Sequence, residues 1–251
     1  MSTSFDPKQY KFAKAFRADG LAASFRFNET SGNFYDTSGT TGVSLLDYGL
    51  PNIHSSGGIL SSNCAYFDGT YFIQIPDISS HIYLHEKVSF CVWLKTTVVP
   101  LGKYVVRFVG STGSPDIRLY ITNGPSSTLY IRIGDLKISG GNNEIQSECT
   151  VPQSLIVDGN WHFIVFTIDR TLSGIDQHKI YIDNVEKTLS LYYSQGSDPS
   201  GDVGKVNIIV GGSPSSYYIT GYIDSLLVFD NKTLTTEEIS NLYNSGSGVE
   251  I

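Results

Sequence analysis

The sequence is poor in features that would point to a nucleic-acid or membrane protein. Only 17 of its 251 residues are Lys or Arg, and the formal net charge is −7. Proteins that bind nucleic acid neutralise phosphates with clustered Lys and Arg, so this balance argues against such a partner. No apolar run approaches the roughly 20 residues that span a bilayer, and the N-terminus lacks the apolar segment of a signal peptide. We therefore expect no membrane insertion and a chain that is soluble as written.

Cysteine is scarce as well. Cys64, Cys91 and Cys149 are too few and too widely spaced for a disulfide framework or a zinc site. Because Cys91 lies within an apolar stretch, we interpret the three as small buried side chains. The sequence also lacks a glycine-rich phosphate loop, a nucleophile elbow and a histidine-rich cluster, so no organic cofactor is expected.

Glycine and tyrosine are plentiful, with 25 and 16 residues, whereas charged residues make up only 16%. This composition favours many strands joined by many turns. The stretch 157–185, VDGNWHFIVFTIDRTLSGIDQHKIYIDNV, is the clearest example. It predicts a strand over 161–169, a polar loop, a second strand over 178–182 and a tight reversal at Asp183-Asn184, so the two strands should pair antiparallel.

Further strands and two helices are predicted along the chain. The strands fall at 22–27, 64–75 with a turn at Asp68-Gly69, 87–96, 104–109, 116–121, 129–133, 205–210 and 221–229. A helix should run from Pro7 to about Ala18, and a second should follow the capping box of Thr235 and Glu238, over 236–243. The fold class is therefore all-β: a two-sheet antiparallel β-sandwich of jelly-roll type with short N- and C-terminal helices.

Three segments together resemble the laminin-G-like, or concanavalin-A-like, jelly-roll family. They are the "D-G-x-W-H" strand described above, the opening ADGLAASFRFNETSGNFYDTSG and the closing GYIDSLLVFDNKTLTTEEISNLY. The closing segment departs from the usual family pattern at Ser225 and Phe229, where Glu and Tyr are common. No linker lies between the segments, so we expect one domain over 21–251, with 1–20 as a helical segment packed on it.

The resemblance implies a structural calcium ion near the two ends of the domain. Its ligands would be the carboxylates of Asp36 and Asp224, with loop carbonyls near Ser38 and Gly39. Calcium takes six to eight oxygen ligands, which a Gly/Ser-rich loop beside a carboxylate can supply. In the alternative, Asp36 forms an Asx-turn with its own backbone, and Asp224 accepts backbone N–H groups from the 36–42 loop without a metal.

The middle strands carry an unusual set of residues opposite their apolar face. Rings stack on the apolar faces of sugars, and Arg donates paired hydrogen bonds to hydroxyls or carboxylates. This face therefore predicts a site for a glycan, an acidic one included, and in the alternative it is a solvated face whose cross-strand pairs only stabilise the sheet. Trp93 taken alone is also typical of a structural residue in this family. The candidate glycan-binding residues are Trp93, Arg107, Arg118, Tyr120, Tyr130, Arg132 and Gln146.

Two enzymatic alternatives compete with a binding role. Glu144, Gln146 and Glu148 alternate like the "E-x-D-x-E" strand of retaining glycosidases, but Gln replaces the central Asp. His162, with Arg and Tyr residues, could serve a uronate lyase, although the usual lyase motifs are missing. The sequence favours a non-catalytic carbohydrate-binding or surface-adhesion module, outside the cell or on a virion surface. The alternative is a polysaccharide-degrading enzyme, for which the sequence favours a uronate lyase over a glycoside hydrolase. The sequence does not identify the glycan or the oligomeric state.

Overall fold

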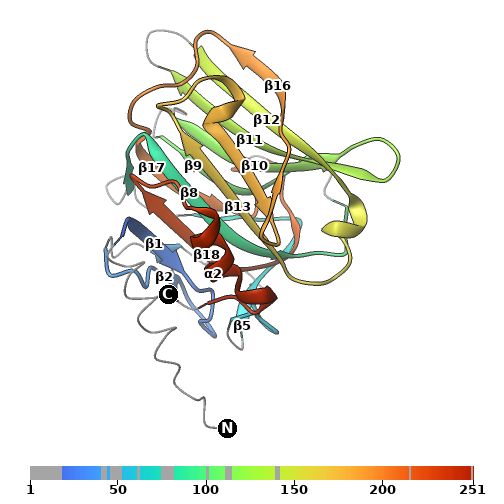
Figure 1. The fold of residues 1–251 in the computed structure, drawn as a ribbon. Helices are drawn as coiled ribbons and strands as arrows, with labels where there is room; N and C mark the ends of the chain where they lie inside the picture. The colour runs from blue at the N-terminus through green and yellow to red at the C-terminus, as the bar shows by residue number, and fades with distance from the viewer. Residues whose placement is uncertain are drawn as a thin grey trace.

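The computed structural model describes residues 19–40, 44–45, 53–60, 63–74, 82–99, 102–110, 115–138, 142–214, 216–249 and 251. These residues form two large antiparallel sheets packed as a sandwich (Figure 1). The predicted fold class is confirmed for this part of the chain. The helix predicted for 7–18 lies outside the described residues. Among the helices that are described, none has the length and apolarity needed to cross a bilayer.

The first sheet has the strand order β15-β14-β13-β8-β18-β5-β4, and β1 pairs with β18. The first and last long segments of the domain therefore lie side by side. The strands of this sheet are β1 (Leu21–Phe25), β4 (His54–Ser56), β5 (Asn63–Asp68), β8 (Lys87–Lys95), β13 (His162–Asp169), β14 (His178–Ile182), β15 (Val185–Lys187) and β18 (Thr220–Asp230).

The second sheet has the strand order β16-β12-β11-β10-β9-β17-β6, and β7 pairs with β17. Its strands are β6 (Ile73–Gln74), β7 (Ile82–Leu84), β9 (Lys103–Val109), β10 (Asp116–Asn123), β11 (Thr128–Ile138), β12 (Asn142–Pro152), β16 (Ser190–Gln195) and β17 (Gly204–Val210). The remaining elements are the small pair β2 (Phe34–Tyr35) and β3 (Ser44–Leu45), helix α2 (Thr236–Tyr243) and the 3-10 turns η2 (Gln153–Leu155), η3 (Gly174–Gln177) and η4 (Asn244–Gly246).

Strict alternation along the strands builds the core between the sheets. Val88, Phe90, Val92 and Leu94 of β8 face it, and the apolar residues of β10 and β11 meet them from the other sheet. Phe90 packs on Phe108 and Phe166, with ring centroids 3.9 and 4.7 Å apart. The strands β13 and β14 pair antiparallel as expected. The turn at Asp68-Gly69 is different from a hairpin, because β5 belongs to the first sheet and β6 to the second.

The outer face of the first sheet carries a second apolar cluster. Cys91 and Trp93 of β8 pack there with Phe163 and with Ile239 and Leu242 of α2, so this strand is buried on both faces. The prediction that the outer face of β8 is open to solvent or to a ligand is therefore wrong, because α2 and the C-terminal residues cover this face. The helix begins at the predicted capping box, whose side-chain and backbone bonds are both present. The three cysteines are free and buried, as expected.

A buried polar cluster joins the sheets at one end. Asp135 of β11 accepts from Nε and Nη2 of Arg170, at 2.9 and 2.5 Å, and Arg170 follows β13 of the other sheet. Ser147 of β12 lies 2.9 Å from Nδ1 of His178, and burial lowers the pKa of this histidine to about 4. These contacts fix the second sheet against the first.

Candidate functional site

The outward face of the second sheet forms two cross-strand rows. Antiparallel register places Arg118 opposite Gly134, and Gly134 opposite Gln146, in the first row. In the second row, Tyr120 lies opposite Arg132, and Arg132 opposite Glu148. Because directly opposite side chains on one face touch, the polar residues of β10, β11 and β12 form one continuous surface.

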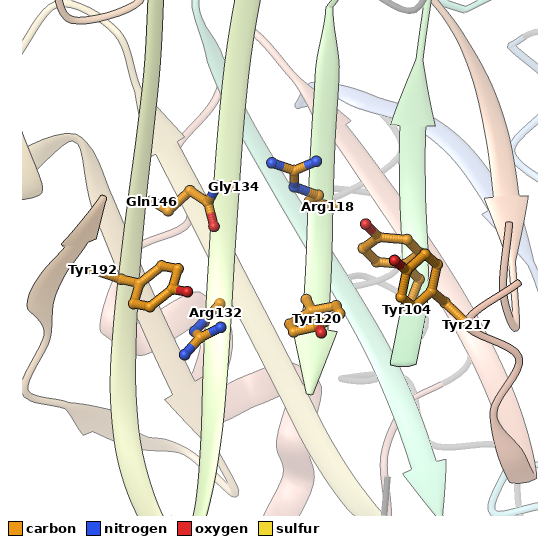
Figure 2. A pocket seen from close by; sticks show the side chains of 8 residues that line it. All are labelled: Tyr104, Arg118, Tyr120, Arg132, Gly134, Gln146, Tyr192 and Tyr217. Atoms are coloured by element: carbon orange, nitrogen blue, oxygen red, sulfur yellow. The ribbon is translucent and has the colours of Figure 1, made fainter. Parts of the chain in front are cut away.

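A cavity of about 230 Å³ opens on this face. Figure 2 shows its rings and guanidinium groups converging from β9 to β16 and from the loop between β17 and β18. Tyr192 and Arg132 stand on one side of the cavity, and Tyr104 and Tyr217 stand together on the other. The lining residues are Tyr104, Arg118, Tyr120, Arg132, Gly134, Gln146, Tyr192 and Tyr217.

Two β-bulges place the tyrosines at the sides of the cavity. The register of β9 and β10 shifts so that Leu119 faces Val106 while Tyr120 faces Tyr104, which leaves Val105 as an extra residue. The register of β12 and β16 also shifts, from Gln146 opposite Tyr193 to Ser147 opposite Leu191, and Tyr192 is the extra residue. A bulge twists its strand locally and redirects a side chain. Here the bulges direct Tyr104 and Tyr192 toward the cavity.

Tyr217 lies in a loop and has a strained backbone. Its φ is +65°, in the left-handed region that a bulky side chain rarely adopts. Its carbonyl accepts the N–H of Tyr104 at 3.1 Å, and its ring lies 5.1 Å from the Tyr104 ring and 6.5 Å from the Tyr120 ring. Yet 44% of the side chain stays exposed. Strain of this kind persists where the surroundings enforce it and often marks a functional site.

Glycines make room for the polar groups. A Cβ at Gly134 would lie 2.6 Å from Nε of Arg118, and one at Gly102 would lie 2.5 Å from the hydroxyl oxygen of Tyr120. Real Cβ atoms essentially never come so close. Gly134 therefore lets the Arg118 side chain lie across the backbone of β11.

Ion pairs run along one edge of the cavity. Arg107 of β9 donates from Nε and Nη2 to the carboxylate of Asp116, at 2.8 and 3.0 Å. Arg118 donates from Nη1 to the same carboxylate at 3.1 Å and from Nη2 to Glu144. Burial alone would lower the pKa of Arg107, but the hydrogen bond and charge of Asp116 raise it above its usual value. For the Tyr104 hydroxyl, burial has the opposite effect and raises the pKa.

Arg132 is held at the centre of the face. Its Nε donates to Glu148 at 2.6 Å, and its guanidinium lies 3.5 Å from the centre of the Tyr192 ring. It also lies 5.4 Å from the ring centre of Tyr130 and 5.9 Å from that of Tyr120. These distances are within the range of cation–π contacts, so the guanidinium is fixed by rings and a carboxylate together.

The structure gathers most of the predicted glycan-binding residues. Arg118, Tyr120, Arg132 and Gln146 line the cavity, and Arg107 and Tyr130 contact its lining from the same face. Trp93 is not there: it lies in the other sheet with 2% of its surface exposed, packed on Phe163 and Tyr243.

Tyr104, Tyr192 and Tyr217 are cavity residues that sequence reasoning missed. Tyr104 stands in a predicted strand, but a bulge sets its direction, while β16 was not predicted and Tyr217 lies in a loop. For Tyr192 and Tyr217, the sequence signal was a tyrosine outside the predicted strands.

The residues of the two enzymatic alternatives already have hydrogen-bond partners within the protein. Glu144 accepts from Arg118 and, at 2.7 Å, from Nε2 of Gln146. Both it and Glu148 therefore act as acceptors for guanidinium groups, whereas a retaining glycosidase needs one carboxyl group as a proton donor. His162 lies in the first sheet, between Asp158 at 2.9 Å and Asp183 at 2.8 Å. That arrangement ties two turns together.

The residues expected to hold calcium have hydrogen-bond donors as neighbours. Oδ1 of Asp36 accepts from the N–H groups of Ser24 and Ser38, both at 2.9 Å, and Oδ2 accepts from the Ser38 hydroxyl. Oδ2 of Asp224 accepts from the N–H groups of Ile59 and Leu60 at 2.8 and 3.3 Å. Gly39 adopts a φ of +77°.

Each of these three carboxylate oxygens, Oδ1 and Oδ2 of Asp36 and Oδ2 of Asp224, accepts from at least one N–H or O–H donor. In the part of the chain that the structure describes, no group of three or more His, Cys, Asp or Glu could hold a metal ion. A calcium ion at Asp36 and Asp224 stays a prediction.

The family model for the concanavalin A-like lectin/glucanases superfamily matches residues 67–240. No curated protein sequence matches this chain. Domain 4 of a GH43 extracellular arabinanase from Geobacillus stearothermophilus, solved in complex with arabinotriose, has a TM-score of 0.54 at 15% identity, covering 91% of this chain and 98% of that one. Trypanosoma rangeli sialidase has a TM-score of 0.58 at 12% identity, covering 97% of this chain but 38% of the sialidase. At these identities the likeness shows the fold alone.

Proposed function

The chain belongs to the concanavalin A-like lectin/glucanase superfamily, and we propose that it is a non-catalytic carbohydrate-binding module that holds a glycan on the outer face of its second sheet. The fold hosts binding modules and enzymes alike, so the choice depends on the site. The observation that carries the proposal is the cavity in which exposed tyrosines flank fixed guanidinium groups. A domain of the same fold holds arabinotriose in the arabinanase, which supports this class of ligand.

The cavity offers the contacts that sugars need. Tyr120 and Tyr192 line the cavity with their rings, and the C–H groups of a sugar can stack on an aromatic ring. Gln146 and Arg132 supply amide and guanidinium donors for hydroxyl groups. Because Arg132 is already held by Glu148 and by the ring of Tyr192, it loses little freedom when a ligand binds.

A surface-adhesion role follows if the glycan belongs to a cell or particle. We therefore also propose that the protein acts outside a cell or on a virion surface, where such glycans are displayed. Immunolabelling of intact and permeabilised cells tests this: signal only after permeabilisation would contradict it.

A glycan array tests the binding proposal. The variant Tyr192→Ala removes a ring that is 50% exposed, so the fold should survive, and binding should weaken roughly fivefold or more because a stacking contact is lost. Tyr35→Ala is the matched control, since Tyr35 is 56% exposed and belongs to β2, outside the cavity. If the protein binds no glycan, or if the two variants bind equally well, the proposal is wrong. New reducing ends or unsaturated uronate absorbance would instead indicate an enzyme.

A further inference from the structure

The guanidinium groups and carboxylates that pair on the proposed glycan face are equal in number. Three guanidinium groups and three carboxylates form the described ion pairs of this face, and each carboxylate accepts from at least one guanidinium. None of the six side chains is more than a quarter exposed. They are Arg107, Arg118 and Arg132 with Asp116, Glu144 and Glu148.

This pairing bears on which sugars fit. An acidic sugar would bring a carboxylate toward Arg118 or Arg132, but Glu144 and Glu148 already hold these groups. The ligand would have to displace a protein carboxylate or lie beside it. Like charges brought together in a partly buried site oppose binding strongly. An acidic ligand therefore meets no uncompensated positive charge at these two arginines.

Neutral sugars meet the opposite situation. A hydroxyl group donates one hydrogen bond and accepts others, so it can use both members of an ion pair. Glu148 is the one hydrogen-bond acceptor that the described residues provide for Arg132, and it engages only Nε. The terminal nitrogens of Arg132 can thus donate to sugar hydroxyls, while Gln146 offers an amide beside them.

We infer that the cavity selects neutral sugars and discriminates against uronate and sialate residues. This inference rests on the proposed glycan-binding function and narrows its ligand class. A cavity of about 230 Å³ is smaller than the roughly 300–1,000 Å³ typical of drug-sized ligands, so it holds a short stretch of a neutral glycan rather than a long one.

Matched ligand pairs provide the test. Trigalacturonate and its fully methyl-esterified form share one backbone, and sialyllactose and lactose form a second pair. With wild-type protein in calorimetric titrations, the neutral member of each bound pair should bind roughly tenfold tighter or more, because a carboxylate meets like charge. The affinity of the neutral member should change little between roughly 0.05 and 0.5 M salt, because no net charge is neutralised.

The variant Glu148→Gln tests the cause. It leaves an acceptor for Arg132 but removes the competing charge, so the preference for the neutral member should shrink at least roughly threefold. Glu186→Gln is the matched control, because Glu186 pairs with Lys179 at the surface of the first sheet. The salt dependence of binding to wild-type protein needs no variant, so it remains a valid test if Glu148→Gln fails to fold.

The outcomes separate the two proposals. If the acidic member binds as tightly as the neutral one, or if its binding falls steeply with salt, the selectivity inference is wrong while glycan binding stands. If neither pair nor any neutral glycan of the array binds, the proposed function fails and the inference fails with it. An unchanged preference in Glu148→Gln would also overturn the inference.

Discussion

Replacing Arg170 by Met should destabilise the sandwich far more than breaking a surface ion pair. The side chains of Arg170 and Asp135 are both 0% exposed. Arg170 donates two hydrogen bonds to the Asp135 carboxylate and two more from Nη1, to the carbonyls of Gly201 at 3.3 Å and Asp202 at 3.0 Å. Met fills a similar volume but leaves these acceptors without donors.

The magnitude follows from the burial of the pair. Removing one partner of a buried ion pair costs about 3–5 kcal/mol, because the other charge stays buried without compensation. For a chain of about this size, each kcal/mol lowers Tm by about 2–4 °C, so Arg170→Met should melt about 6–20 °C below wild type. Urea titration should show the same loss as a lower midpoint with an unchanged slope.

Two further variants make the test specific. Lys179→Met breaks the exposed Lys179–Glu186 pair, whose atoms lie 3.7 Å apart, and should cost no more than about 1 kcal/mol. The double variant Asp135→Leu with Arg170→Met removes both buried charges and should recover part of the lost stability. If Arg170→Met melts within about 2 °C of wild type, or if the double variant is less stable than the single one, the reasoning is refuted.

Three other predictions concern the site and the turns. Gly134→Ala should weaken glycan binding roughly tenfold with little change in Tm, because its Cβ would displace a guanidinium that lies 2.6 Å away; binding equal to wild type would contradict this. Burial lowers the pKa of His162, but hydrogen bonds to Asp183 and Asp158 raise it above its usual value. The stabilisation from protonated His162 is therefore present below about pH 6.5 and is lost as pH rises through the pKa of the folded state. Between about pH 6 and pH 9, the Tm of wild type should fall more than the Tm of His162→Gln. Equal changes in the two Tm values would contradict this prediction. If calcium binds at Asp224, a chelator should lower the Tm of wild type but not that of Asp224→Asn. If the carboxylate is held only by its described hydrogen bonds, the chelator should leave both Tm values unchanged, and that result would exclude the calcium ion.

Local rules predicted the regular parts of the molecule. Alternation assigned the core faces of β8, β10 and β11, because each side of a strand meets one environment over its whole length. The capping box located the start of α2, because the signal lies within four consecutive residues. The burial of the outer face of β8, where Trp93 lies, was not predicted, because the helix that covers it lies far along the chain. Arg170 lies in the predicted polar loop, but its burial was not predicted, because its partner Asp135 belongs to the other sheet.

The candidate site depends on departures from those rules. Tyr192 faces the cavity through a bulge, and Tyr217 stands beside it with a positive φ that a tyrosine rarely adopts. A regular period of two would misplace Tyr192, and it does not apply to Tyr217, which lies in a loop. Irregularities of this kind cost stability, so they are expected where function requires a particular geometry. Arg132 lies in a regular strand and was predicted as a site residue. The Tyr192 ring that fixes Arg132 could not be predicted, because a one-residue shift in register decides which side chain of β16 lies above Arg132.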